Sequence, residues 1–242
     1  MSHGRRRGGI SARLRRGLLV ADDSPKSQMF EQFAVVAKAL GHGNRLELLE
    51  HLAQSEHAVE DLAALSGLSL ANTSQHLQRL RRAGLVRARK SGTRVICRLA
   101  DDEILALVGV LRRVAERNLA EVDRLVSGYY DSRDKLEPVS RRELLRRIRE
   151  GTVTVLDVRP KAEYLAGHVA GARNITPGEL AERLDELNEG QEIVAYCRGA
   201  YCVVSFETVA LLRDRGFNVR RLEDGFPEWK AAGLPVAVGA TE

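Results

Sequence analysis

Two cysteines lie five positions apart in the stretch YCRGAYCVVSF, residues 196–206, of a chain that has three cysteines in all. Cys197 ends an apolar run, and Cys202 opens a segment with helical character. A loop that leads from a buried strand into a helix presents backbone N–H groups and the positive end of a helix dipole, which favour an anion. The thiolate, not the thiol, attacks sulfur. We therefore expect Cys197 to be ionised and reactive.

The other residues of this loop suggest how a small sulfur-bearing anion is held. Gly199 lets the backbone curl, while Arg198 and Tyr201 orient or shield the anion. Cys202 has two interpretations. It is either a small structural residue in the first helical turn, or a resolving thiol that joins a persulfide or sulfenate of Cys197 in a disulfide or sulfur bridge.

An α/β alternation surrounds the loop. The near-continuous apolar run of residues 153–158 is typical of a buried parallel strand, and further strands are expected at 193–196 and 219–222. Helices are expected at 140–149, 160–166, 177–187, 203–215 and 227–232. This order predicts an α/β domain with a central parallel sheet over residues 139–242. A polar, charged linker, 129–138, precedes it.

Motifs in this half resemble the rhodanese family. They are VTVLDVRPKAEYLAGHVAGARNI and IVAYCRGAYCVVSFETVALLRDRGFNVRRLEDGFPEWKAAGLPV. The matching positions are Asp157, Arg159, Glu163, Gly167, His168, Gly171, Ala172, Cys197, Asp224, Gly225 and Trp229. The resemblance implies that Cys197 takes a sulfane sulfur from thiosulfate or a polysulfide, holds it as a persulfide and passes it on. Asp157 is carried over into the candidate catalytic set.

Two positions depart from related loops. Phosphatases with a similar loop need an arginine six positions after the nucleophile, where this chain has Val203. At the fifth position, where sulfurtransferases often carry serine, threonine or arginine, it has Cys202. We therefore expect no phosphate chemistry and no efficient housekeeping thiosulfate turnover.

The first half of the chain is basic. Residues 1–100 hold 17 lysines and arginines against 8 acidic residues, and the remainder holds 21 against 25. This imbalance favours a polyanionic partner for the first half only. Residues 1–24 are rich in arginine and glycine without apolar periodicity, which predicts a disordered basic arm.

Residues 25–128 show a mainly helical pattern. Apolar spacing predicts helices from Pro25 to Leu40 and around Leu46–Leu52, then at 59–65, and a fourth capped by Ser69 with the stripe Leu70, Thr73, Leu77 and Leu80. A basic hairpin follows, with Val95, Cys97 and Leu99 facing inward. A long helix is expected over 101–127. Its apolar stripe suits packing against a second copy.

Helix, turn, helix and basic hairpin form the layout that places the second helix in the DNA major groove. Polar side chains on the fourth helix suit base contacts, and basic side chains on it and on the hairpin suit phosphate contacts. The candidate DNA-binding residues are Ser69, Ala71, Asn72, Ser74, Gln75, Gln78, Arg79, Arg82, Arg87, Arg89, Lys90 and Arg94.

This half resembles the ArsR family of dimeric winged-helix repressors, through AKALGHGNRLELLEHL, LSGLSLANTSQHLQRLRRAGLVRARKSGTRVICRL and the following long helix. The resemblance implies a homodimer through the first and last helices that reads a two-fold symmetric operator in double-stranded DNA. The family's metal-sensing cysteines are missing from the third helix. Cys97 alone cannot form a ligand shell, so we expect no metal and no cofactor.

The two halves together predict a cytoplasmic repressor whose rhodanese domain senses or transfers sulfane sulfur through Cys197. No apolar run is long enough for a membrane span. One alternative is a sulfurtransferase that uses the winged helix for docking or dimerisation. Another is a metal-responsive ArsR repressor with a vestigial second domain.

Overall fold

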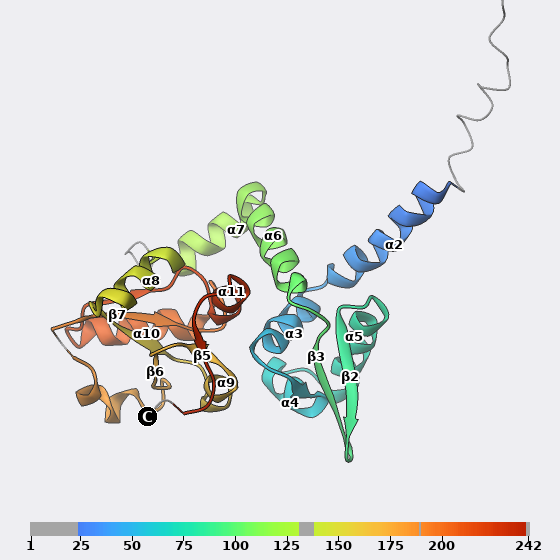
Figure 1. The fold of residues 1–242 in the computed structure, drawn as a ribbon. Coiled ribbons are helices and arrows are strands. Elements are labelled where there is room, and N and C mark those ends of the chain that lie inside the picture. Colours follow the sequence, from blue (N-terminus) through green and yellow to red (C-terminus); the bar gives the residue numbers. More distant parts are fainter. Residues whose placement is uncertain (1–23, 131–137, 189, 241–242) are drawn as a thin grey trace, which may run out of the picture.

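The computed structural model describes residues 24–130, 138–188 and 190–240 (Figure 1). The N-terminal domain, residues 24–130, is mainly helical. Its elements up to the hairpin are α2 (Pro25–Leu40), α3 (Gly43–Gln54), β1 (His57–Ala58), α4 (Val59–Ser66), α5 (Leu70–Arg82), β2 (Val86–Ser91) and β3 (Arg94–Leu99). The three strands form one antiparallel sheet in the order β1-β3-β2.

Local sequence explains the position of α5. The Ser69 side chain accepts a hydrogen bond from the Asn72 amide (3.3 Å) and begins the helix. Thr73, Leu77 and Leu80 are buried against the domain core, as expected. The prediction for Leu70 is wrong: it keeps 52% of its surface exposed, because it lies in the first turn beyond the edge of the core.

Two further expectations in this domain need correction. Val95 is exposed near the hairpin tip, beyond the reach of the core that buries Cys97 and Leu99. The long helix expected over 101–127 is broken into α6 (Glu103–Asn118) and α7 (Ala120–Leu125), followed by a π-helical turn, Val126–Tyr130. The Asn118 side chain donates to the Val114 carbonyl (2.7 Å), which satisfies a helix-end acceptor, and Leu119 turns extended.

The C-terminal domain, residues 138–240, contains a four-stranded parallel sheet in the order β6-β4-β7-β8. Its strands are β4 (Val153–Asp157), β6 (Arg173–Asn174), β7 (Glu192–Tyr196) and β8 (Val219–Arg221), with a separate pair β5 (His168–Val169) and β9 (Val236–Ala237). Its helices are α8 (Arg141–Glu150), α9 (Lys161–Ala166), α10 (Val203–Asp214) and α11 (Phe226–Ala231). The predicted fold class is confirmed.

Both faces of this sheet are covered, which explains its apolar strands. Leu156 and Ala195 lie in one core cluster with Val209 of α10. Their neighbours Val155 and Val194 belong to a second cluster with Leu144 and Trp229, on the face of α8 and α11. Side chains that alternate between these two clusters bury both faces of β7, an inner strand of the sheet. The carboxyl end of β7 leads into the loop that bears the two cysteines.

The helix expected over 177–187 is wrong. Two short 3₁₀ turns, Leu180–Glu182 and Leu184–Glu186, take its place. The Glu179 carboxylate accepts from the Thr176 amide (3.0 Å) and hydroxyl (2.8 Å). Thr176 thus donates to the carboxylate instead of capping a helix, and Gly178 lowers the helix propensity of the first turn.

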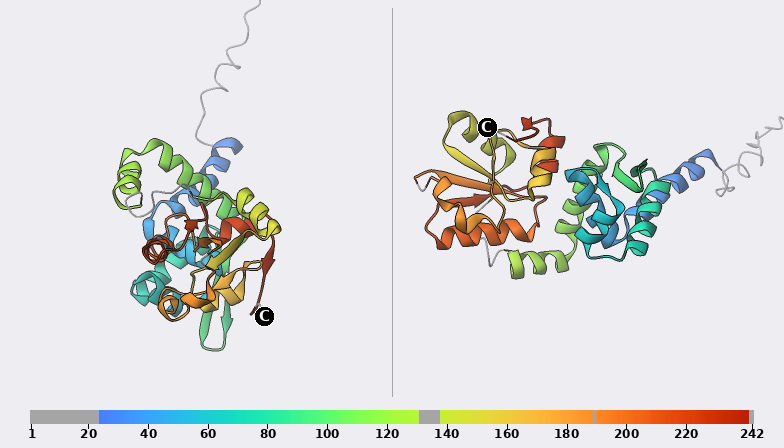
Figure 2. Two further views of the ribbon diagram at one scale, coloured as in Figure 1. Left: turned by 90° about the vertical axis from the view of Figure 1, so that its left-hand side faces the viewer. Right: turned by 90° about the horizontal axis from the view of Figure 1, so that it is seen from below.

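The two domains lie side by side, joined along the chain by α7 (Figure 2). Helix α11 packs against α6 and α3 of the N-terminal domain, so the contact involves elements far apart in sequence (Figure 1). The predicted arm, 1–24, lies outside the described residues except for Ser24, which caps α2, and most of the predicted linker also lies outside them. Within the described chain, no helix has the length and apolar character needed to cross a membrane.

Candidate functional site

The two cysteines occupy the two ends of the loop that follows β7. Cys197 is the first residue after the strand, and its carbonyl accepts from the Phe226 amide (3.1 Å). Cys202 is the N-cap residue of α10, and its amide donates back to the Gly199 carbonyl (3.2 Å). Cys197 is only 2% exposed, whereas Cys202 is half-buried. The more accessible sulfur therefore belongs to Cys202.

The two thiols share a hydrogen bond that shifts their pKa values in opposite directions. The pKa of Cys202 falls to about 6, because the Cys197 thiol donates to its sulfur and the Arg198, Val204 and Ser205 amides stabilise the thiolate. The pKa of Cys197 is raised well above its ordinary value by the same hydrogen bond and by burial. The helix N-terminus belongs to Cys202, so these contacts favour ionisation of Cys202, and a reactive Cys197 thiolate stays a prediction.

Arg198 and Tyr201 are both engaged with carboxylates. Arg198 forms an ion pair with buried Glu163, through Nε (3.0 Å) and Nη2 (2.5 Å). The Tyr201 hydroxyl donates to Glu116 of α6 (2.7 Å). Because Glu163 balances its charge, Arg198 adds little net positive potential to the loop.

Two glycines allow close backbone contacts around the loop. A side chain at Gly225 would place its Cβ 2.3 Å from the Arg198 carbonyl oxygen. At Gly199 a Cβ would lie 2.7 Å from Oε1 of Glu50, a residue of α3. A side chain at Gly199 would therefore displace the end of the Glu50 side chain, whereas one at Gly225 would meet fixed backbone.

Asp157 lies in a buried network at the end of β4, apart from the two thiols. Its carboxylate pairs with Arg159 (2.7 Å) and accepts from the Tyr196 hydroxyl (2.5 Å). Asp157, Arg159 and Tyr196 are each fully buried. This network fixes the ends of adjacent strands β4 and β7, so we interpret Asp157 as positioning the loop. Its inclusion among the catalytic residues stays a prediction.

Gln54, at the end of α3, joins this network to the N-terminal domain. Its Nε2 donates to the Arg198 carbonyl (3.2 Å), and its Oε1 accepts from Arg159 Nη1 (3.0 Å). Gln54 is 5% exposed, so both amide atoms are satisfied in a buried contact between the domains. Gln54 was not among the residues predicted from the sequence. The polar residues Glu47, Glu50 and Gln54 recur at helical spacing on α3, and this stripe is the sequence feature that indicates a polar contact there.

Arg112 of α6 makes a second polar contact between the domains. It pairs with Asp224 (3.1 Å), which precedes α11, and with Glu228 (3.4 Å), which lies in the first turn of α11. Arg112 is also within 3.4 Å of Glu116, the acceptor of Tyr201. The C-terminal domain is thus held against both α3 and α6.

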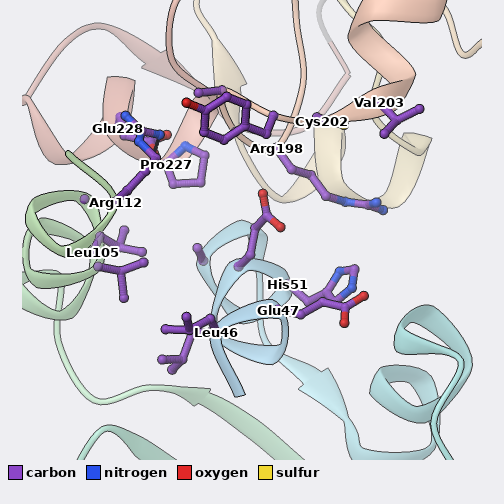
Figure 3. Close-up of a pocket in the computed structure, with 18 of the residues that line it drawn as sticks. Leu46, Glu47, His51, Leu105, Arg112, Arg198, Cys202, Val203, Pro227 and Glu228 are labelled. Carbon is purple, nitrogen blue, oxygen red and sulfur yellow. Dashed lines mark hydrogen bonds and ion pairs between the residues drawn. The ribbon is translucent and has the colours of Figure 1, made fainter. Parts of the chain in front are cut away.

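A cavity of about 550 Å³ lies between the domains beside the loop (Figure 3). Its apolar wall comes from α3 and α6, and its polar residues come from both domains. The lining includes Leu46, Leu49, Glu50, His51, Leu105, Val108, Arg112, Arg198, Tyr201, Cys202, Pro227 and Glu228. Cys202 faces this space, whereas Cys197 lies behind it.

Most of the predicted DNA-contact side chains are exposed on α5 and on the hairpin. On α5 the side chains of Ala71, Asn72, Gln75, Gln78, Arg79 and Arg82 are exposed, and Ser74 is half-buried. Ser69 is occupied as the helix cap. Arg87 and Lys90 are exposed on β2. These side chains are accessible on α5 and the hairpin, and their contact with DNA stays a prediction.

Two hairpin arginines also make ion pairs inside the domain. Arg89 pairs with Glu56. Arg94 pairs with Asp61 (2.5 Å) and lies 3.7 Å from Glu60. These carboxylates offset part of their charge, so Arg87 and Lys90 are the stronger candidates for phosphate contact.

Cys97 is 1% exposed in the core of the N-terminal domain, and burial raises the pKa of its thiol. It packs among leucines, including Leu85 and Leu99, as a small apolar residue. Across the described residues, no three histidine, cysteine or acidic side chains are grouped to hold a metal ion.

Two family models match the chain. Residues 42–88 match the bacterial regulatory protein, arsR family, and residues 140–232 match the rhodanese-like domain. A solved structure, the winged helix-turn-helix domain of Mb0332 from Mycobacterium bovis, is 39% identical, covers 42% of this chain and 94% of its own, and has a TM-score of 0.38.

Curated relatives extend the match. The HTH-type transcriptional regulator YgaV of Escherichia coli is 33% identical over 85 residues, 35% of this chain and 86% of that protein. The HTH-type transcriptional regulator Rv0324 of Mycobacterium tuberculosis is 46% identical over 215 residues, 89% of this chain and 94% of that protein. The chain therefore belongs to the ArsR family of HTH-type transcriptional regulators, in the form that carries a rhodanese-like domain after the DNA-binding domain.

Proposed function

We propose that this regulator is a repressor that releases its operator when sulfane sulfur modifies the Cys197–Cys202 pair. A thiolate attacks the sulfane sulfur of a donor, a new S–S bond forms, and the donor's S–S bond breaks with its electron pair leaving on the donor thiolate. The sulfur comes to rest as a Cys197 persulfide, beside the loop amides.

One observation carries the proposal: the DNA-binding domain contacts the backbone of the reactive loop itself, through Gln54 and the Arg198 carbonyl. Cys197 is almost completely buried in a close-packed core. We infer that an additional sulfur atom on this buried side chain displaces the loop. Movement of Arg198 breaks its contact with α3.

Helix α3 links the loop to the DNA-binding surface, because α3 packs directly against α5, the candidate recognition helix. A shift of α3 changes the placement of Asn72 and Gln75 relative to a fixed DNA groove. The coupling needed for a regulatory response is modest, about 1–3 kcal/mol.

The proposed active form is a homodimer on a two-fold symmetric site in double-stranded DNA. Apolar side chains of α2 are exposed in the single chain, among them Met29 (57%), Phe30 (59%) and Phe33 (59%). Val110 and Val114 of α6 are exposed by 48% and 43%. A second copy that covers α2 and α6 buries these faces. The Mb0332 domain is described as homodimeric.

The test is operator affinity measured at one fixed salt concentration, before and after polysulfide treatment. We expect about a tenfold loss of affinity for the wild type. Cys197→Ser should bind DNA normally and lose the response, whereas Cys97→Ala, a matched control in the DNA-binding core, should keep it. Equal affinities before and after treatment of the wild type contradict the proposal.

A second candidate function is sulfurtransferase activity with the winged helix as a docking module. The half-buried Cys202, which faces an open cavity, favours it, because a carrier needs access to the sulfur. Two results together support this candidate over sensing. The protein turns over thiosulfate and cyanide in a reaction that depends on Cys197, and its affinity for the operator does not change when sulfur is added.

A further inference from the structure

We propose that the cavity between the domains is the binding site for an uncharged or positively charged organic persulfide, which delivers its sulfane sulfur first to Cys202. This inference rests on the proposed function, because it names the donor that the sensing site takes. It also places Cys202 ahead of Cys197 in the transfer.

The size of the cavity and its walls indicate an organic carrier. Its volume of about 550 Å³ lies within the range of small-molecule sites, about 300–1,000 Å³. An inorganic anion such as thiosulfate fills a minor part of that space. Leu46, Leu49, Leu105 and Val108 form an apolar surface that suits the carbon skeleton of a carrier.

The charges at the cavity disfavour anions. Glu50 and Glu228 line it, together with Glu47. The two lining arginines are already paired: Arg112 with Asp224 and Glu228, and Arg198 with Glu163. A dianion such as thiosulfate must therefore approach Cys202 past Glu47 and Glu50, which no arginine pairs among the described residues, whereas an ammonium group finds partners there.

Glu50 shows this shortage of positive charge most clearly. Glu50 is an exposed residue that lines the cavity, and the close packing of both domains around it removes part of its hydration. This desolvation, together with the charges of Cys202, Glu228 and Glu47, raises its pKa to about 7, and Arg198 acts in the opposite direction. A cationic group bound here favours the ionised carboxylate.

His51 is a buried, neutral wall residue of the cavity. Its side chain is more than nine-tenths buried and lines the cavity on the side of Arg198 (Figure 3). Within the described residues, its Nδ1 has no hydrogen-bond partner. Burial, with the nearby charge of Arg198, lowers its pKa to about 4, so the ring is neutral.

The sulfane sulfur moves from the donor to Cys197 in two exchange steps. The Cys202 thiolate attacks the outer sulfur of R–S–SH, the donor S–S bond breaks, and RS⁻ leaves with the electron pair, which gives Cys202–S–SH. Cys197 then attacks the same outer sulfur and passes its proton to the departing Cys202 sulfur, so the Cys202 S–S bond breaks and the products are Cys197–S–SH and a Cys202 thiol. Each step is an exchange, so no external oxidant or reductant is needed.

The test compares persulfides of three carriers of similar size: cysteamine, 2-mercaptoethanol and mercaptoacetate. The rate of sulfur incorporation into the Cys197–Cys202 peptide is followed by quenched mass spectrometry at pH 8. We expect the cationic cysteamine donor to react about tenfold faster than the anionic donor, with the neutral donor between them. Cys197→Ser should accumulate the persulfide on Cys202.

Two variants connect the preference to the cavity. Glu50→Gln should bring the cationic and anionic rates within about threefold of each other, whereas Glu207→Gln, an exposed carboxylate on α10 outside the lining, should leave the ratio unchanged. Leu105→Trp fills the apolar wall and should slow all three organic donors more than inorganic polysulfide.

Equal rates for the three donors, or a faster anionic donor, overturn the cavity proposal. First incorporation at Cys197, with no persulfide on Cys202 in Cys197→Ser, overturns the order of transfer. Both results are distinct from a failure of sensing, because operator release by polysulfide is measured separately and can persist without any donor preference.

Discussion

The side-chain amide of Gln54 spans the two domains: it donates to the carbonyl of Arg198 (3.2 Å), the residue that follows Cys197. The same amide accepts from Arg159 (3.0 Å), whose guanidinium is anchored on Asp157. One residue of the DNA-binding domain therefore touches both the reactive loop and the network behind it. Through this contact, a change in the conformation of the loop can be transmitted to α3.

Replacement of this amide should uncouple the domains. Gln54→Ala leaves Arg159 Nη1 and the Arg198 carbonyl without this partner, which should lower the free energy of unfolding by about 1–3 kcal/mol. Operator affinity of the reduced protein should change little, while its response to polysulfide should fall to near zero. Thermal unfolding and DNA-binding titrations measure the two effects.

The matched control is Gln191→Ala. Gln191 also uses both amide atoms, toward Thr154 and the Gly151 carbonyl, but it lies within the C-terminal domain. Its loss should leave the polysulfide response intact. A full response in Gln54→Ala would show that the signal takes another route.

The hydrogen bond from Cys197 sets the ionisation of Cys202. Removal of the donor in Cys197→Ala should raise the pKa of Cys202 from about 6 toward its ordinary value. Cys197→Ser keeps a hydroxyl donor and should preserve part of the shift. Thiolate absorbance or the pH dependence of alkylation gives the pKa directly. A Cys202 that still titrates near 6 in the alanine variant would assign the shift to the α10 amides alone.

The raised pKa of Glu50 predicts a pH dependence for domain docking. Its pKa is about 7 in the folded protein and 4.5 ordinarily, so the docked state holds a proton that the separated state releases between these values. Glu50 therefore favours docking at low pH, and its contribution is lost as the pH rises through about 7. Thermal unfolding between pH 5 and 8 measures this trend.

Other ionisable groups at this interface also change stability with pH, so the stability of the wild type must be compared with that of Glu50→Gln at each pH. The charged groups that face Glu50 are Cys202, Arg198, Glu228 and Glu47. Neighbouring His51 has the opposite pH dependence: its pKa is lowered in the folded protein, so it reduces stability as the pH falls below its ordinary value of 6.5. At pH 5 the protonated Glu50 resembles glutamine, so the two proteins should be similar there, and the difference should grow toward pH 8, with Glu50→Gln the more stable. A difference that is constant across this range would contradict the role assigned to Glu50.

Two substitutions separate base recognition from phosphate contact. Gln75→Ala on α5 should cost about 1–3 kcal/mol on the operator and little on unrelated DNA. Lys90→Ala on β2 should weaken both DNAs alike and reduce the slope of log affinity against log salt by about 1. Fluorescence anisotropy over a salt series distinguishes them. Equal losses on both DNAs for Gln75→Ala would remove it from base readout.

The sequence predicted the elements that depend on local patterns. Ser69 caps α5, β7 delivers Cys197 to the loop, and Cys97 is buried, because capping, apolar runs and alternation are local signals. The break at Leu119 and the two 3₁₀ turns were missed, because side-chain hydrogen bonds of Asn118 and Glu179 override helical periodicity.

The ionisation of the cysteines could not be predicted from spacing alone. It depends on which sulfur lies at the N-terminus of α10 and which donates the shared proton, and both follow from the folded loop. The contact of Gln54 with Arg198 joins residues 144 positions apart, so no local pattern reports it. The interface and its cavity arise only when the two domains pack.

The most direct test of the account measures cysteine modification and operator occupancy on the same samples. A polysulfide titration at fixed salt gives the fraction of the Cys197–Cys202 peptide that carries sulfur and the fraction of DNA released. The account predicts that release follows modification of this peptide across the titration, with Cys97 unmodified. Full modification with the operator still bound, or release with both loop cysteines unmodified, would contradict it.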